Sequence, residues 1–327
     1  MTKKIVLNAA KVILAAGLLW WLVDSGKLDW EMLLTLRRYP HRLLLAFGFC
    51  FLNLLLVTVR WRFILAARTE SAPMPLRKLF LVNWIGMFFS TVLPGSVTGD
   101  VVKVFYVRRQ HKELSHAFLL FSCLLDRVMG LTGLILLMGV FSVANYSALV
   151  VMSPRLSTLL GFNFMLLGAV VGGLLAYFFL PAGWQARFEA WARARPKAKL
   201  PLRVAELWRD LTAVRGRVAL AVAISVAVQF LSVVIFYLLV SPQFVTGLSL
   251  PMVLSFIPLG FMAIALPISP AGLGVGHAAF EALFAFAGEP GGANFFNMYF
   301  VVMLTFNLLG ALPWLAWRSR DDRGMSN

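Results

Sequence analysis

The chain has 327 residues, of which 60% are hydrophobic and only 13% are charged, and its formal net charge is +16. In soluble domains about a quarter of all residues are usually charged. The composition therefore excludes a water-soluble globular protein and predicts an all-α polytopic membrane protein. The excess of Lys and Arg does not indicate a nucleic-acid partner, because cytoplasmic loops of membrane proteins collect these residues and no nucleic-acid-binding motif is present.

The first two predicted spans flank a short outer segment. The apolar run at residues 5–23 is longer than the core of a usual signal peptide, so we expect a retained membrane helix rather than a cleaved leader. Residues 26–42 are expected to form a short helix on the outer membrane surface. The second span, residues 43–59, is closed by Arg60, Trp61 and Arg62.

The next apolar run is too short for a full span. Residues 79–93 number only 15 before Pro94, whereas a crossing helix needs about 20, so they predict a re-entrant hairpin. The run at 117–146 is long enough to cross, but Asp126 and Arg127 interrupt it. Ionisable residues inside a span are costly and are therefore candidates for function.

A further span at 156–180 precedes the most polar stretch of the chain. The span contains Gly168-Ala-Val-Val-Gly172, a pattern of small residues that is typical of close helix packing. Residues 184–217 combine nine basic residues with interleaved aromatic side chains. This combination predicts a cytoplasmic, basic amphipathic linker that lies on the inner face of the membrane.

The last part of the chain contains two more spans and a second short hairpin. The spans are residues 218–240 and 297–317. Between them, the apolar pieces 252–266 and 273–287 are split by prolines and glycines, which predicts a hairpin that returns to its own side of the membrane.

The two hairpin turns have similar sequences. Both read L-P-x-S-x-x-G, at residues 93–99 and at residues 266–272. The similarity predicts an inverted repeat, with a first half at about 43–146 and a second half at about 218–317, and with the two broken helices meeting inside the membrane. The alternative is chance, because Pro, Gly and Ser mark many turns.

The distribution of charge predicts the orientation. With the N-terminus in the cytoplasm and each hairpin returning to its own side, 23 of the 30 basic residues fall on the inner side. Because basic residues favour cytoplasmic loops, we expect about six full transmembrane helices plus two re-entrant helical hairpins, with both termini in the cytoplasm. The five basic residues left on the outer side are Lys27, Arg37, Arg38, Arg42 and Arg155.

The motifs around the two turns resemble a known family. In combination they are similar to the membrane domain of lysylphosphatidylglycerol synthase/flippase proteins, over roughly residues 8–317. The resemblance implies a single stand-alone flippase-like domain in the bacterial inner (plasma) membrane, whose ligands are lipids with an anionic or phosphate-bearing head group. The motifs are Asn83, the run 93–103, Arg108-Arg109, Asp126-Arg127 and the run 267–275.

Two features depart from the pattern of this family. The synthases carry a soluble C-terminal domain that transfers lysine from its tRNA, whereas this chain ends ten residues after Trp317. We therefore expect no lysyl transfer and no enzyme activity. The family often has an Arg-Glu pair after the Gly-Leu-Gly-Val run, where this chain has Gly276 and His277, so any role of that pair is in doubt here.

The polar residues of the first hairpin each have two interpretations. Asp100 follows the turn, where an acid favours a helix N-terminus, but the same backbone amides would bind an anion. Lys103, Arg108 and Arg109 form either an ordinary cytoplasmic basic cluster or a set of charges for a lipid phosphate.

Asp126 and Arg127 fall near the membrane midplane if their helix begins at residue 117, and near the surface if it begins at about residue 124. Neighbours in sequence do not face each other on a helix, so each needs its own partner. The pairs to test are Asp126–Lys103 and Arg127–Asp100.

The second hairpin holds a further pair. His277 and Glu281 are i, i+4 neighbours on one helical face, and form either a structural pair or a proton-coupled site. The histidine and cysteine spacings predict no metal and no cofactor. The candidate lipid-binding residues are Asn83, Pro94, Gly95, Ser96, Gly99, Asp100, Lys103, Arg108, Arg109, Asp126, Arg127, Pro267, Ser269, Gly272, Gly274, His277 and Glu281.

Three classes of function fit this pattern. The favoured one is a protein that translocates, or helps to translocate, a lipid or glycolipid between leaflets, because paired broken helices offer a polar surface inside the membrane. The alternative is an accessory scaffold for a partner enzyme of lipid or cell-envelope biosynthesis, docked through residues 184–217. A membrane transferase is less favoured, because no nucleophile, metal motif or outer carboxylate pair supports it.

Overall fold

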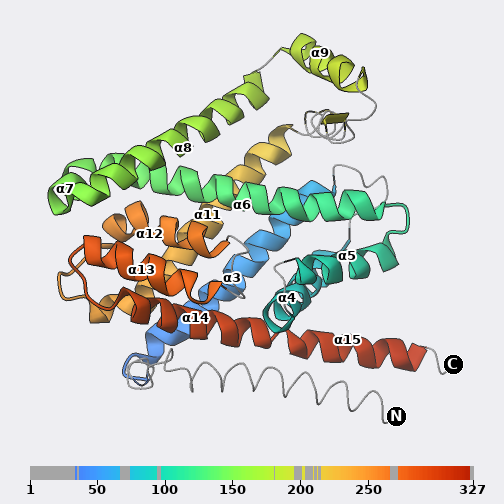
Figure 1. Cartoon of the computed structure of the whole chain (residues 1–327). Helices are drawn as coiled ribbons and strands as arrows, with labels where there is room; N and C mark the ends of the chain where they lie inside the picture. Colours follow the sequence, from blue (N-terminus) through green and yellow to red (C-terminus); the bar gives the residue numbers. More distant parts are fainter. Residues whose placement is uncertain are drawn as a thin grey trace.

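The computed structural model describes residues 34, 37–66, 74–93, 97–179, 181–194, 201–202, 209, 212, 215–265 and 272–324. The first expected span, residues 5–23, therefore lies outside the described residues, as do the turn residues 94–96 and 266–271. In the described part the chain is helical, without strands (Figure 1). The helices are α3 (Pro40–Leu65), α4 (Leu76–Val92), α5 (Thr98–Gln110), α6 (His116–Ala144), α7 (Tyr146–Met152), α8 (Pro154–Phe179), α9 (Ala182–Arg193), α11 (Arg215–Val240), η1 (Ser241–Gln243), α12 (Leu250–Ala265), α13 (Val275–Phe286), α14 (Gly292–Leu308) and α15 (Ala311–Gly324).

Five helical segments in the described part are long and apolar enough to cross a membrane. They confirm the all-α polytopic class, and they correspond to the five expected spans that fall on described residues. The spanning segments are Pro40–Leu65, His116–Ala144, Thr158–Phe179, Arg215–Gln243 and Gly292–Trp317.

The ends of these helices follow from local sequence. α3 has Pro40 at its first position, where the missing N–H costs nothing and the fixed φ suits a helix. α6 is capped by the Ser115 hydroxyl, which accepts a hydrogen bond from the Phe118 N–H at 3.1 Å. Arg42, expected in a surface segment before the second span, is instead part of the first turn of α3.

The two hairpins consist of short helices. α4 has 17 residues and α12 has 16, which correspond to about 26 Å and 24 Å of helix against a hydrocarbon core of about 30 Å. Their returning helices, α5 and α13, are shorter still, with 13 and 12 residues.

Glycine allows the first hairpin to close tightly. A Cβ added at Gly99 would lie 2.1 Å from Ser90 Oγ and 2.2 Å from the Gly86 carbonyl oxygen. Because no Cβ fits at that distance, α5 can pack this closely on α4 only with glycine at this position.

In the second hairpin, glycine is required by the backbone. Gly272 and Gly274 have φ values of +74° and +84°, a region that residues with a side chain rarely adopt. Gly276 follows in α13, where an added Cβ would lie 2.3 Å from the Phe296 ring. The G-x-G-x-G run is thus accounted for by a turn and by helix packing.

The hairpins open toward opposite ends of the bundle. The α5–α6 connection lies at the same end as α9 and the end of α15, whereas the α13–α14 connection lies at the other end, where α7 also lies (Figure 1). The order of a long span, two short helices and a further long span also occurs twice. The first case is α3–α6, and the second is α11–α14, where α14 continues into α15 to form the span Gly292–Trp317.

Most of the core is built from aromatic and aliphatic side chains of α3, α6 and the second half of the chain. Phe236 of α11 is fully buried and its ring packs against Phe261, Phe280 and Phe284. The Gly168–Gly172 pattern was expected to mediate helix packing, but a Cβ added at either glycine meets nothing within 4 Å in the described structure. That expectation is wrong for contacts within the described part of the chain.

Candidate functional site

A bidentate ion pair inside the helix bundle joins α3 to α6. Arg60 Nε and Nη2 donate to the two carboxylate oxygens of Asp126 at 2.7 and 2.9 Å. Both side chains are at least 90% buried, and Arg60 Nη1 also donates to Ser225 Oγ of α11 at 3.1 Å. Asp126 was expected to pair with Lys103, but its carboxylate is bound by Arg60.

A second carboxylate lies between two cations. Asp100 Oδ1 is 3.0 Å from Lys103 Nζ, and Asp100 Oδ2 accepts from Arg127 Nη2 at 2.7 Å and from Nε at 2.9 Å. The predicted contact between Arg127 and Asp100 is therefore present. Asp100 lies in the first turn of α5, but the cap residue before that helix makes no side-chain capping bond, and the interactions of the carboxylate are with cations.

Neighbouring polar contacts orient this cluster. Lys103 Nζ lies 5.1 Å above the Trp61 ring, within range of a cation–π interaction. The Trp61 indole N–H donates to Ser122 Oγ at 3.1 Å. Asn83 donates through Nδ2 to Thr58 Oγ1 at 3.1 Å, and both side chains are buried.

A cavity of about 230 Å³ adjoins the charged residues. It is lined by residues of α4, α5 and α6 and by one residue of α14. The cavity is not sealed, because the Arg127 side chain is 44% exposed. We refer to it as the charged cavity; it is lined by Gly86, Met87, Ser90, Asp100, Lys103, Cys123, Asp126, Arg127 and Asn307.

The charges of this cluster do not cancel. Among its ionised side chains, the cations outnumber the carboxylates, and the sum is one positive charge. An excess positive charge in a low-dielectric interior attracts an anion. The cations are Arg60, Lys103 and Arg127, and the carboxylates are Asp100 and Asp126.

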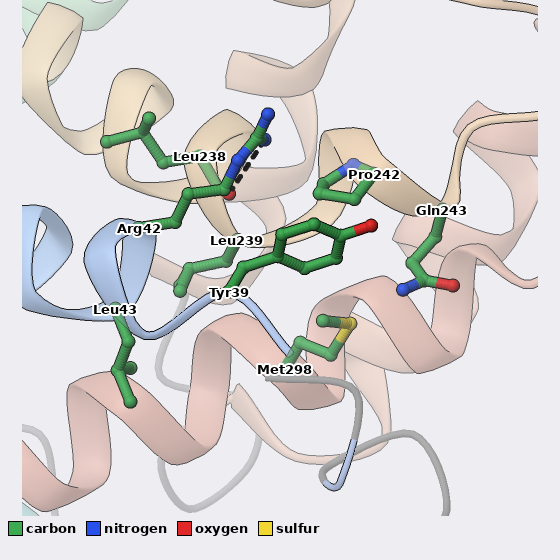
Figure 2. Close-up of a pocket in the computed structure, with 8 residues that line it drawn as sticks. All are labelled: Tyr39, Arg42, Leu43, Leu238, Leu239, Pro242, Gln243 and Met298. Carbon is green, nitrogen blue, oxygen red and sulfur yellow. Dashed lines mark hydrogen bonds between the residues drawn. The ribbon is translucent and has the colours of Figure 1, made fainter. Parts of the chain in front are cut away.

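A much smaller pocket lies at the other end of α3 (Figure 2). It has a volume of only about 10 Å³ and is lined by Tyr39, Arg42 and residues of α11 and the following turn. The Arg42 guanidinium donates to Ser241 Oγ at 2.9 Å and to the Leu238 carbonyl oxygen at 3.4 Å. This arginine therefore stabilises the C-terminal end of α11, and the pocket is too small for a lipid head group.

Arg108 and Arg109 lie in the last turn of α5, away from the charged cavity. Arg108 donates to the carbonyl oxygen of Lys112 at 2.8 Å and to that of Leu114. Its guanidinium thus organises the α5–α6 connection.

The structure places His277 and Glu281 apart from the charged cavity. His277 Nδ1 accepts from the Gly274 N–H at 3.2 Å, so its Nε2 donates to Asn297 Oδ1, at 2.8 Å. Glu281 accepts from the Ala293 N–H at 2.8 Å. The two side chains therefore have different partners, and the expected contact between them is not formed. Pro94, Gly95, Ser96, Pro267 and Ser269 lie outside the described residues.

Comparison with known proteins agrees with the expected family. The family model of the lysylphosphatidylglycerol synthase TM region matches residues 8–314, which is most of the chain. The chain belongs to this family. None of the curated proteins and none of the solved structures gives a significant match.

Several residues of the charged site in this lysylphosphatidylglycerol synthase TM region were not among the candidates predicted from the sequence, and Arg60 and Asn307 are two of them. The sequence predicts Arg60 to be a basic residue that closes a span, but Asp126 inside a later span indicates that a buried cation is needed. Asn307 of α14 lines the charged cavity, and an asparagine near the end of an apolar run carries no signal that distinguishes it from an interfacial residue.

Proposed function

We propose that this protein binds the phosphate of an anionic lipid head group in the charged cavity and helps to move that lipid between the leaflets of a bacterial inner membrane. The observation that carries the proposal is the excess positive charge beside a cavity within a helix bundle that crosses the membrane. Family membership supports a role connected with membrane lipids.

The chemistry of the cluster favours a singly charged phosphodiester. Each of the three cations is already paired with a carboxylate, and one further anion would bring the sum of the charges to zero. Arginine is suited to phosphate because its planar N–H groups bind two oxygens at once. Arg127 is the most exposed of the three cations, so we assign it the first contact with the phosphate.

The first hairpin supplies the other requirement for translocation. A head group can cross hydrocarbon only along polar groups, and broken helices provide these where they line a cavity. The first hairpin contributes cavity walls through α4 and α5, and residues of α6 and of α14 complete the lining.

An accessory role in lipid or cell-envelope synthesis is the second candidate, and α9 is the observation that favours it. Trp184 and Trp191 are 58% and 46% exposed on this helix, which stands at the end of α8 away from the main bundle (Figure 1). Arg187 lies over the Trp184 ring. An exposed surface of aromatic and basic residues would suit either a partner enzyme or anionic lipids.

Reconstitution distinguishes the two roles. Purified protein in vesicles should accelerate the exchange of a fluorescently labelled phosphatidylglycerol between leaflets, measured by quenching of the outer leaflet. We expect Arg127→Gln to slow this exchange about tenfold, with Arg109→Gln, an exposed arginine outside the cavity, as the matched control. Exchange no faster than in protein-free vesicles would exclude unaided translocation and favour the accessory role.

A further inference from the structure

The two arginine–carboxylate pairs of the charged cluster differ in how exposed their cations are. The side chains of Arg60 and Asp126 are 5% and 10% exposed, so an incoming anion has no direct access to either group. In the other pair, the Asp100 side chain is 8% exposed, but that of Arg127 is 44% exposed. An anion that enters the charged cavity therefore reaches Arg127 first, and it meets a guanidinium that a carboxylate already binds.

The Asp100 carboxylate has a second cation on its own helix. Its Oδ1 is 3.0 Å from Lys103 Nζ, whereas the other oxygen, Oδ2, accepts from Arg127 Nη2 at 2.7 Å. The two cations use different oxygens of one carboxylate. Loss of Arg127 would therefore leave Asp100 paired with Lys103 within α5. A buried carboxylate without any partner is strongly destabilising, and this exchange does not create one.

We infer that Asp100 is a displaceable internal counter-anion, which pairs with Arg127 while the cavity is empty and gives up Arg127 to the phosphate of the ligand. This inference rests on the proposed function, and it adds how access to that same site is controlled. A phosphate competes with a carboxylate for arginine because both accept two N–H groups of the guanidinium. In the occupied state each cation has one anion, and the pairs are Arg60 with Asp126, Lys103 with Asp100, and Arg127 with the phosphate.

This exchange has a consequence that a purely structural role of Asp100 does not have. The carboxylate competes with the ligand, so the affinity of the wild type is lower than Arg127 would give without a competitor. Removing the carboxylate should therefore strengthen the binding of a phosphate. If Asp100 only shaped the site, its removal would weaken binding or leave it unchanged.

The test measures the binding of short-chain phosphatidylmethanol, a phosphodiester with one negative charge, to the full-length protein in neutral detergent by calorimetry. We expect Asp100→Asn to bind this lipid about tenfold more tightly than the wild type, because a neutral amide competes less well for a guanidinium than a carboxylate does. This variant also raises the sum of the charges and leaves Lys103 buried without its carboxylate.

The double variant Asp100→Asn with Lys103→Met separates competition from net charge. It removes one anion and one cation, so the sum of the cluster remains one positive charge, as in the wild type. No buried ammonium is left without a partner, so this variant decides the result if the single variant does not fold. We expect it to bind phosphatidylmethanol about fivefold more tightly than the wild type, because Arg127 no longer has a charged competitor.

Two further variants distinguish this inference from the proposed site itself. Arg127→Gln removes the cation for which the two anions compete and should weaken binding about tenfold, whereas Arg109→Gln, outside the cavity, should bind like the wild type. If the double variant binds no more tightly than the wild type while Arg127→Gln still weakens binding, the exchange is overturned and the phosphate site stands. If Arg127→Gln binds as tightly as the wild type, the phosphate site is wrong, and the exchange is overturned with it.

Discussion

Arg60 and Asp126 are each buried and bonded to the other through two hydrogen bonds. Such a pair adds little net stability when complete, but breaking it leaves an uncompensated charge in a low-dielectric interior. At the scale of single residues, the pair acts as a specific connection between α3 and α6, because only this geometry satisfies both groups.

We predict that Asp126→Asn destabilises the protein by about 3–5 kcal/mol, because it leaves the Arg60 guanidinium buried without its counter-charge. The double variant Arg60→Met with Asp126→Leu should recover most of that loss, because it removes both charges. Thermal unfolding in detergent would measure the difference. A double variant no more stable than Asp126→Asn would contradict the assignment of the pair.

The site was only partly predictable from individual residues. Asp126 and Arg127 stood out because charges inside an apolar run are rare, and the Arg127–Asp100 contact was among the pairs proposed for testing. The partner of Asp126 was not found, because Arg60 has the same local sequence signature as any basic residue at the end of a span. Only the packing of α3 against α6 shows that it is buried.

At the scale of helices, the two hairpins are held by different chemistry. Ion pairs connect α5 to α6 in the first. In the second, the hydrogen bond between His277 and Asn297 and the phenylalanines around Phe236 connect α13 to its neighbours. The sequence predicted both hairpins from length and proline content, but similar turn motifs gave no indication of this difference.

We predict that Gly99→Ala destabilises the first hairpin severely, because the new Cβ would overlap Ser90 Oγ and the Gly86 carbonyl oxygen. The loss should be at least the 1–3 kcal/mol typical of overpacking, and the yield of folded protein in detergent should fall. Gly168→Ala in α8 is the control, because nothing lies within 4 Å of the added Cβ, and we expect it to be neutral or slightly stabilising. Equal stability of the two variants would argue against the close approach of α4 and α5.

At the scale of the whole molecule, the arrangement of the described helices agrees in one respect with the distribution of basic residues expected across the membrane. The basic last turn of α5, with Arg108 and Arg109, and the basic residues of α9 lie at one end of the bundle (Figure 1). The orientation of that end toward the cytoplasm remains a prediction, because no membrane side follows from the helix arrangement alone.

Cysteine labelling tests this orientation. We predict that Val245→Cys, in the 78% exposed position before α12, reacts with an impermeant thiol reagent in intact cells. Lys112→Cys in the exposed α5–α6 connection should react only after permeabilisation. The native Cys50 and Cys123 are buried and should give little background. Glu289, in the connection between α13 and α14, is not a suitable position for labelling. It is 1% exposed, and its carboxylate accepts hydrogen bonds from the N–H groups of Val245 and Thr246. The reverse labelling pattern would contradict the predicted topology.

The ion pair between Asp100 and Arg127 also constrains how the chain is made. The two residues are 27 positions apart, which is roughly one to five seconds of synthesis at 5–20 residues per second. Until α6 has left the ribosome, the carboxylate of α5 lacks its arginine, and entry of α5 into hydrocarbon is unfavourable. The first hairpin should therefore insert together with α6, as one unit delivered by the translocation machinery, rather than helix by helix.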